Sequence, residues 1–281
     1  MESHSLALVR NELARRGVAF TDSPAAPGAL LAEPSGLNTL ASGPAAWILP
    51  HGGRLSEALA DPLERHPRVL WLAQRDGAQP ADWELEAAAN FLLDRSLIPA
   101  PHGLRQRVDS FEGISRGSAW AAECAAKAGG GRVAQERAQD TAHELLANAI
   151  LDAPVDAEGK PRYAHRRHEQ PQIAPEDACA LEVGAEANRL YVSVVDRFGR
   201  FGPGPLVKAL RGIGGRAKVD SSGGGAGLGL RRLLESSELL AVRVRWGRAT
   251  EVVAVISLGD ERRRSGGQKS LFFRADGVES A

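Results

Sequence analysis

The sequence predicts an α/β protein with a smaller N-terminal α/β domain, residues 1–103, and a larger C-terminal domain, residues 104–281. A length of 281 residues suits two modest domains. Strand-like and helix-like segments alternate along the chain, which is the pattern of an α/β fold. Pro99, Pro101 and Gly103 interrupt this pattern, and we expect the domain boundary there.

In the N-terminal domain, Leu6, Val9 and Leu13 recur at helical spacing and predict an amphipathic helix over residues 4–16. Short apolar runs predict strands at 45–49 and 69–72, and helical patterns cover 54–65 and 83–93.

In the C-terminal domain, residues 153–175 are rich in Pro, Asp, His and Arg and predict a loop. Residues 199–225 are rich in Gly and Pro. The remaining pattern predicts helices at 118–127, 134–151 and 228–235, and strands at 178–183, 190–195, 239–246, 250–257 and 268–273.

The charge of the chain excludes some partners. Its 35 basic and 35 acidic residues give a net charge of +0, so there is no basic excess to bind nucleic acid or an anionic membrane. No apolar run approaches the roughly 18 residues of a membrane helix, and the N-terminus lacks the apolar stretch of a signal peptide. We therefore expect a cytoplasmic protein in which Cys124 and Cys179 are free thiols.

The first motif is a polar stripe on the helix predicted over 134–151. Glu144, Asn148 and Asp152 are spaced by four and share one helix face. The opposite face can pack on a sheet through Leu145, Leu146, Ala149 and Ile150. A solvated helix face has the same appearance, so the stripe alone leaves both interpretations open.

The second motif is a β-branched strand that ends in Asp196, followed by Phe198 and Gly199. A carboxylate at a strand end can accept a hydrogen bond from an exocyclic amine, and a nearby glycine lets a flat ring approach the backbone. An Asp that starts an ordinary turn is the alternative.

The third motif is the glycine run from Gly223 to Gly229, which leads directly into an apolar helix. Glycines permit close approach, and the free N–H groups of a helix N-terminus bind phosphate. A flexible linker is the alternative, although linkers rarely run straight into an apolar helical pattern.

Other phosphate and metal motifs do not fit. A P-loop needs Ser or Thr after its Lys, but Pro161 follows Lys160. Leu230 stands where the dinucleotide fingerprint has its last glycine, and Ala147 stands where a zinc protease has its second His.

Taken in order, the three motifs resemble those of the GHKL ATPase superfamily. Glu144 with Asn148 resembles its N box, Asp196 to Gly199 its first glycine box, and Gly225–Leu230 its second.

The resemblance covers roughly Val133–Ser257 and is nearest to bacterial histidine-kinase-like ATPase domains, particularly the anti-sigma-factor serine kinases. Thr250 resembles the late Gly-Thr position of these domains, although Arg248 and Ala249 separate it from Gly247.

The resemblance implies a Bergerat fold for residues 104–281: a two-layer α/β sandwich with a mixed sheet and helices on one face. It implies that Glu144 polarises the attacking water or hydroxyl and that Asn148 binds Mg²⁺. Asp196 would bind the adenine amine, with Thr250 supporting it through water.

The backbone of the second glycine box would contact the ATP phosphates, and Gly202–Ser222 would form a mobile lid. The residues expected around the nucleotide further include Asp152, Phe198, Gly199, Gly225, Gly227, Leu228 and Gly229.

The chain departs from the superfamily pattern in its first glycine box, where Phe198 and Arg200 replace the two usual glycines. There is also no His between Gly103 and Asp140 that could serve as the phosphoacceptor of a sensor kinase. The N-terminal domain is a candidate for a degenerate receiver-like module without the acidic cluster that phosphorylation needs.

The function expected from the resemblance is an ATP-binding signalling regulator that phosphorylates a partner protein on serine or threonine with Mg²⁺. The alternative is a non-catalytic nucleotide sensor whose lid controls a protein interaction. Both interpretations expect a regulatory protein partner, and both are compatible with a homodimer.

Overall fold

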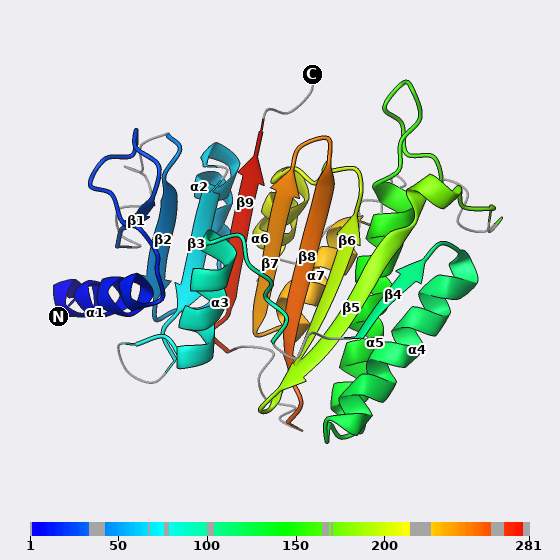
Figure 1. Cartoon of the computed structure of the whole chain (residues 1–281), viewed down its shortest axis with the longest axis horizontal. Helices are drawn as coiled ribbons and strands as arrows, with labels where there is room; N and C mark the ends of the chain where they lie inside the picture. Colours follow the sequence, from blue (N-terminus) through cyan, green and yellow to red (C-terminus); the bar gives the residue numbers. More distant parts are fainter. Residues whose placement is uncertain are drawn as a thin grey trace. The chain divides into compact units, whose positions relative to one another are not determined.

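The computed structural model of the protein describes residues 2–33, 43–66, 68–75, 79–99, 104–164, 169, 171–213, 226–259 and 267–277. The fold is α/β with parallel and antiparallel strands, as the sequence predicts (Figure 1). The chain divides into two compact units. The first contains Met1–Leu97, Pro203–Ala217 and Gly266–Ala275, and the second contains Ile98–Gly202, Lys218–Ser265 and Asp276–Ala281.

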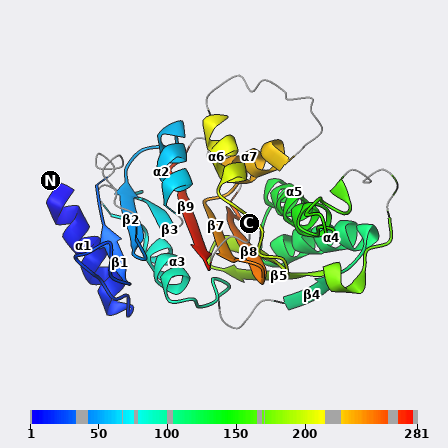
Figure 2. The same ribbon diagram turned by 90° about the horizontal axis from the view of Figure 1, so that it is seen from above.

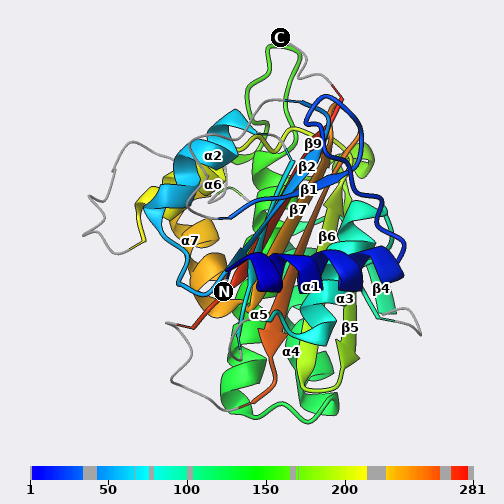
Figure 3. The same cartoon turned by 90° about the vertical axis from the view of Figure 1, so that its left-hand side faces the viewer.

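The first unit is built on four strands. Three parallel strands lie in the order β1 (Ala29–Leu31), β2 (Ala46–His51) and β3 (Arg68–Ala73), and β9 (Ser270–Asp276) pairs antiparallel with β3. The helices of this unit lie on both faces of its sheet, with α2 and α6 on one face and α1 and α3 on the other (Figures 2 and 3). Their bounds are α1 (Glu2–Arg15), η2 (Glu57–Leu59), α2 (Ala60–Arg65), α3 (Asp82–Leu92) and α6 (Gly204–Arg211).

Buried polar contacts tie β9 and the residue before it to the N-terminal strands. The Glu84 carboxylate, 0% exposed, accepts bonds from Arg75 Nε at 2.8 Å and from the Ser270 hydroxyl at 2.8 Å. Burial raises the pKa of Glu84, and the bonds from Arg75 and Ser270 oppose this shift. His51 Nε2 lies 3.0 Å from the carbonyl oxygen of Lys269, and burial lowers the pKa of His51 to about 4.

The second unit contains a five-stranded sheet in the order β7-β8-β6-β5-β4. All four strand pairs are antiparallel. The strands are β4 (Leu104–Val108), β5 (Cys179–Glu186), β6 (Arg189–Asp196), β7 (Leu239–Arg245) and β8 (Ala249–Ser257).

Helices α4 (Phe111–Lys127), α5 (Arg132–Ala147) and α7 (Ala226–Ser236) cover one face of this sheet (Figure 2). Two short helical turns, η3 (Asn148–Asp152) and η5 (Pro175–Asp177), complete the unit. Helices α4 and α5 pack closely because their contact is lined by alanines, of which Ala121, Ala125, Ala134, Ala138 and Ala142 are fully buried.

Three features differ from the sequence prediction. The strand pairs described within the second unit are all antiparallel, and the parallel pairs of the sheet lie in the first unit, whereas the resemblance implied a mixed sheet within residues 104–281. The first unit has the strand order β1-β2-β3, which differs from the 2-1-3-4-5 order of a receiver-type fold. Residues 203–217 and 266–275 fall with the N-terminal segment, whereas the predicted boundary at residue 103 placed them in the C-terminal domain.

Candidate functional site

Asp196 lies at the end of β6, directly opposite Thr250 at the start of β8. Its side chain is only 7% exposed. The Oδ1 atom accepts three backbone hydrogen bonds, from Phe198 N at 2.8 Å, Gly199 N at 3.2 Å and Thr250 N at 3.3 Å. Because all three bonds end on one oxygen, the orientation of the carboxylate is fixed and its other oxygen keeps the capacity to accept from a ligand donor.

Burial raises the pKa of Asp196, and the backbone bonds and the Thr250 side chain lower it again. The Thr250 hydroxyl is 1% exposed and has no hydrogen-bond partner of normal geometry among the described residues. A buried hydroxyl without such a partner is uncommon in native proteins. Asp196 and Thr250 therefore form a small polar site with unused hydrogen-bonding capacity.

Gly199 has a structural role at the turn between β7 and β8. Its φ of 59° lies in the left-handed region, and an added Cβ would lie 2.8 Å from the backbone nitrogens of Arg248 and Ala249 and still closer to the carbonyl oxygen of Arg245. The missing side chain thus makes room for the turn between β7 and β8. The space that a Cβ at Gly199 would occupy is therefore filled by backbone atoms of the protein itself.

The residues that replace the usual glycines lie outside the core. Phe198 is half-buried and Arg200 is exposed. An added Cβ at Gly159 would lie 3.7 Å from Arg200 Nη2, so the loop after α5 approaches Arg200.

That loop is held by the buried carboxylate of Asp177. It accepts a bond from the Tyr163 hydroxyl at 2.6 Å and lies 3.0 Å from Arg162 Nη1. These contacts anchor the end of the hairpin-like turn in which Val155 pairs with Pro161.

The polar stripe lies where α5 ends. The predicted helix over 134–151 is α-helical to Ala147 and then widens into the π-helical turn η3, in which Ala153 N donates to Asn148 O at 3.0 Å. Glu144, Asn148 and Asp152 are all half-buried rather than fully solvated. Helix α5 packs against β6 and α7, and η3 contacts β6, so the stripe lies beside the elements that carry Asp196 and Gly229.

Gly229 lies in the first turns of α7, where it faces Glu144. A Cβ added at Gly229 would overlap the Glu144 Oε2 atom and lie 3.0 Å from its Cδ. Because Gly229 has no side chain, the Glu144 carboxylate fits between α5 and α7. Arg232, 78% exposed, lies 3.9 Å from the other Glu144 oxygen. Arg232 was not among the predicted site residues, although it lies on the same helix as Gly229 and three residues after it.

The rest of the predicted phosphate site is only partly covered by the structure. Gly223, Gly224 and Gly225 lie outside the described residues, and Gly227 and Leu228 belong to the first turn of α7. Free backbone N–H groups are a general property of such a first turn.

The predicted mobile lid over Gly202–Ser222 is wrong in its first half. Residues 204–211 form α6, whose Leu206 and Leu210 are fully buried. Arg211 makes ion pairs of 3.1 Å with both Asp61 and Glu64 on or beside α2. A proline is favourable in the first turn of a helix, so Pro203 and Pro205 do not prevent this structure. Residues 214–222 lie outside the described part of the chain.

The comparisons with known proteins are negative. No protein-family model matches the sequence, and no curated protein is significantly similar to it. No helix in the described ranges is long and apolar enough to cross a membrane. No three His, Cys, Asp or Glu side chains gather as a metal site in the part of the chain that the structure describes. Mg²⁺ bound to a nucleotide uses few protein ligands, so this finding does not bear on a Mg-ATP site.

Proposed function

We propose that the second unit binds Mg-ATP and that the protein is a nucleotide-dependent signalling regulator. The observation that carries the proposal is the Asp196 carboxylate, which is buried, fixed through one oxygen and placed beside the Thr250 hydroxyl. An exocyclic amine donor next to a ring nitrogen, as in adenine, matches this pair of an acceptor and a hydroxyl. The first turn of α7 and the stripe on α5 supply groups suited to the rest of the nucleotide.

The side chains at the end of α5 fit the metal in their chemistry. Mg²⁺ prefers hard oxygen ligands, and the Asn148 amide oxygen is one. When bound, Mg²⁺ would neutralise charge on the phosphates. Glu144, half-buried beside α7, would orient or deprotonate a water or hydroxyl.

Two versions of this function remain as candidates. In the first, Glu144 acts as a base and the protein transfers phosphate to a serine or threonine of a partner. In the second, ATP is bound without turnover and the nucleotide state controls a protein interaction.

The test compares nucleotide binding by the full chain with that of three variants. We expect Asp196→Asn to bind ATP about 10- to 100-fold more weakly, since a charge-assisted hydrogen bond contributes about 1.5–3 kcal/mol. Asn148→Ala should lose the dependence of ATP binding on Mg²⁺. Glu144→Gln should bind ATP normally. Asp140→Asn, the same change on the exposed side of α5, is the matched control.

Calorimetric titration with ATP and GTP, with and without Mg²⁺, measures these effects. Unchanged ATP binding by Asp196→Asn, or equal loss in Asp140→Asn, would contradict the adenine assignment. Single-turnover phosphate release then separates the two versions. A kinase or ATPase turns over ATP and loses this activity in Glu144→Gln, whereas a sensor shows no turnover in the unmodified chain.

A further inference from the structure

Two turns of the second unit lie side by side at one end of its sheet (Figure 1). One turn is residues 197–200, which follow β6, and the other is residues 246–248, which join β7 to β8. Gly247 N donates to Gly199 O at 3.2 Å, and a Cβ added at Gly199 would lie 2.8 Å from Arg248 N. Backbone contacts therefore hold the two turns together as one surface, which we call the turn pair.

The turn pair carries three arginines whose charge is not paired by the fold. Arg197, Arg200 and Arg248 are exposed. Within the described ranges, their side chains make no hydrogen bond or ion pair with another residue. Their guanidinium donors are therefore available to an anionic partner.

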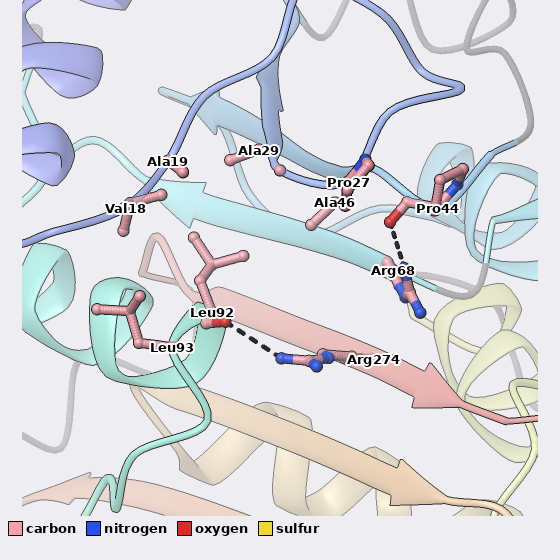
Figure 4. Close-up of a pocket in the computed structure, with 11 residues that line it drawn as sticks. Val18, Ala19, Pro27, Ala29, Pro44, Ala46, Arg68, Leu92, Leu93 and Arg274 are labelled. Atoms are coloured by element: carbon pink, nitrogen blue, oxygen red, sulfur yellow. Dashed lines mark hydrogen bonds between the residues drawn. The ribbon is translucent and has the colours of Figure 1, made fainter.

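Arginines elsewhere in the protein are used by the fold. In the pocket of the first unit shown in Figure 4, Arg68 Nη1 donates to the carbonyl oxygen of Pro44. Arg274 Nη1 donates to the carbonyl oxygen of Leu92 at 3.2 Å in the same pocket (Figure 4). These two side chains join parts of the pocket wall, whereas the arginines of the turn pair have no such contact among the described residues.

The turn pair also contains two aromatic side chains, Phe198 and Trp246, which are both half-buried. A Cβ added at Gly202 would lie 3.7 Å from Trp246 Cη2, so the indole lies along the backbone there and leaves part of its surface exposed. Arginine and tryptophan are enriched at the positions that contribute most to protein–protein binding. The composition of the turn pair is therefore that of a protein contact surface.

Acidic residues beside the turn pair limit the size of an anionic partner. The loop after α5 approaches Arg200, since a Cβ added at Gly159 would lie 3.7 Å from Arg200 Nη2. This loop contains the exposed Glu158 and the half-buried Asp156. A continuous polyanion, such as nucleic acid or an anionic membrane, would be repelled by these carboxylates. A short acidic protein segment has few charges and fits between them.

We propose that the turn pair docks a short acidic segment of a partner protein. Its Glu or Asp side chains bind Arg197, Arg200 and Arg248, and its apolar side chains pack on Trp246. A guanidinium group fits a carboxylate with two parallel hydrogen bonds. The docking surface does not depend on ATP binding, and it is tested in the absence of nucleotide.

The probe is a short fluorescein-labelled peptide in which Glu and Leu alternate, and its neutral counterpart has Gln in place of Glu. Binding to the full-length protein is measured by fluorescence anisotropy at low salt, where exposed charges are screened least. We expect a triple variant with Arg197→Gln, Arg200→Gln and Arg248→Gln to bind the acidic peptide at least about 10-fold more weakly.

The matched control removes the same charge from three exposed arginines of the second unit outside the turn pair. It combines Arg105→Gln, Arg116→Gln and Arg132→Gln, and it should bind the acidic peptide as the unmodified protein does. Thermal unfolding and circular dichroism establish that each variant is folded. Should the turn-pair variant not fold, Arg248→Gln alone is compared with Arg105→Gln, and we expect it to weaken binding about 2- to 5-fold.

Absence of binding between the acidic peptide and the unmodified protein overturns the proposal. So do equal binding of the Gln peptide, unchanged binding by the folded turn-pair variants, and an equal loss in the matched control. Oligothymidylate and phosphatidylserine vesicles are the alternative polyanions. Tighter binding of either one, lost in the turn-pair variant, would assign the surface to nucleic acid or to a membrane and overturn the assignment to a protein segment.

Discussion

Gly199 and Gly247 offer a matched pair of alanine substitutions in one turn region. Gly199 has φ 59° and Gly247 has φ 66°, so both lie in the left-handed region that disfavours a side chain. An added Cβ at Gly247 meets nothing within 4 Å. The same atom at Gly199 would meet backbone nitrogens at 2.8 Å and the Arg245 carbonyl oxygen even closer.

The cost of the left-handed backbone and the cost of overpacking can be separated. The left-handed backbone costs a non-glycine residue about 1–2 kcal/mol, and this applies to both positions. Overpacking adds about 1–3 kcal/mol, and it applies to Gly199 alone because the neighbouring atoms are backbone and cannot rotate away. We therefore expect Gly247→Ala to lower the free energy of unfolding by about 1–2 kcal/mol and Gly199→Ala by about 2–5 kcal/mol.

Urea unfolding of both variants, followed by circular dichroism, gives the two free energies from midpoint and slope. Equal losses in Gly199→Ala and Gly247→Ala would refute the packing role of Gly199.

Two further predictions concern Glu144 and His51. The first uses a double-mutant cycle of Gly229→Ala and Glu144→Ala. When the Glu144 carboxylate is absent, the alanine at 229 should stabilise α7 by up to about 1 kcal/mol. When the carboxylate is present, the alanine must displace it, so we expect a coupling free energy of unfolding of about 0.5–1.5 kcal/mol between the two changes. His51, 4% exposed, has its pKa lowered to about 4 from 6.5. The unfolded chain therefore binds a proton first as the pH falls, and folding should lose up to about 3 kcal/mol between pH 6.5 and 4.

Urea unfolding midpoints measure both the coupling between Gly229 and Glu144 and the pH dependence of stability. Additive losses, within about 0.3 kcal/mol, would show that Gly229 and Glu144 are not in contact. For the pH effect, His51→Gln keeps a donor for the Lys269 carbonyl. The free energy of unfolding of this variant should depend less on pH over the same range. An identical pH profile in this variant would remove His51 as the cause.

The regular elements of the core were predictable because their sequence patterns are strong. Helix α5 has apolar residues at helical spacing, and β6 and β8 are rich in β-branched residues. β4 was missed because Leu104–Val108 is polar and mostly exposed, with no alternation. The helix α6 was missed because Pro203 and Pro205 were interpreted as loop residues.

The site was predictable only as a set of residue types. The structure places Asp196 opposite Thr250, two residues whose proximity depends on the pairing of β6 with β8. Pairing register between distant strands depends on long-range packing that a single sequence does not reveal. The same limit hid the proximity of Gly229 to Glu144, and it hid the pairing of β3 with β9.

The pairing of β3 with β9 has a consequence for synthesis of the chain. β3 leaves the ribosome roughly 200 residues before β9, which at about 5–20 residues per second is a delay of about 10–40 s. During that interval the hydrogen-bonding edge of β3 has not yet received its partner, and Glu84 has not yet met Ser270. Exposed strand edges are sites of intermolecular pairing. The sheet of the first unit is therefore complete only after β9 has been made, and faster translation shortens the interval in which the edge of β3 is exposed.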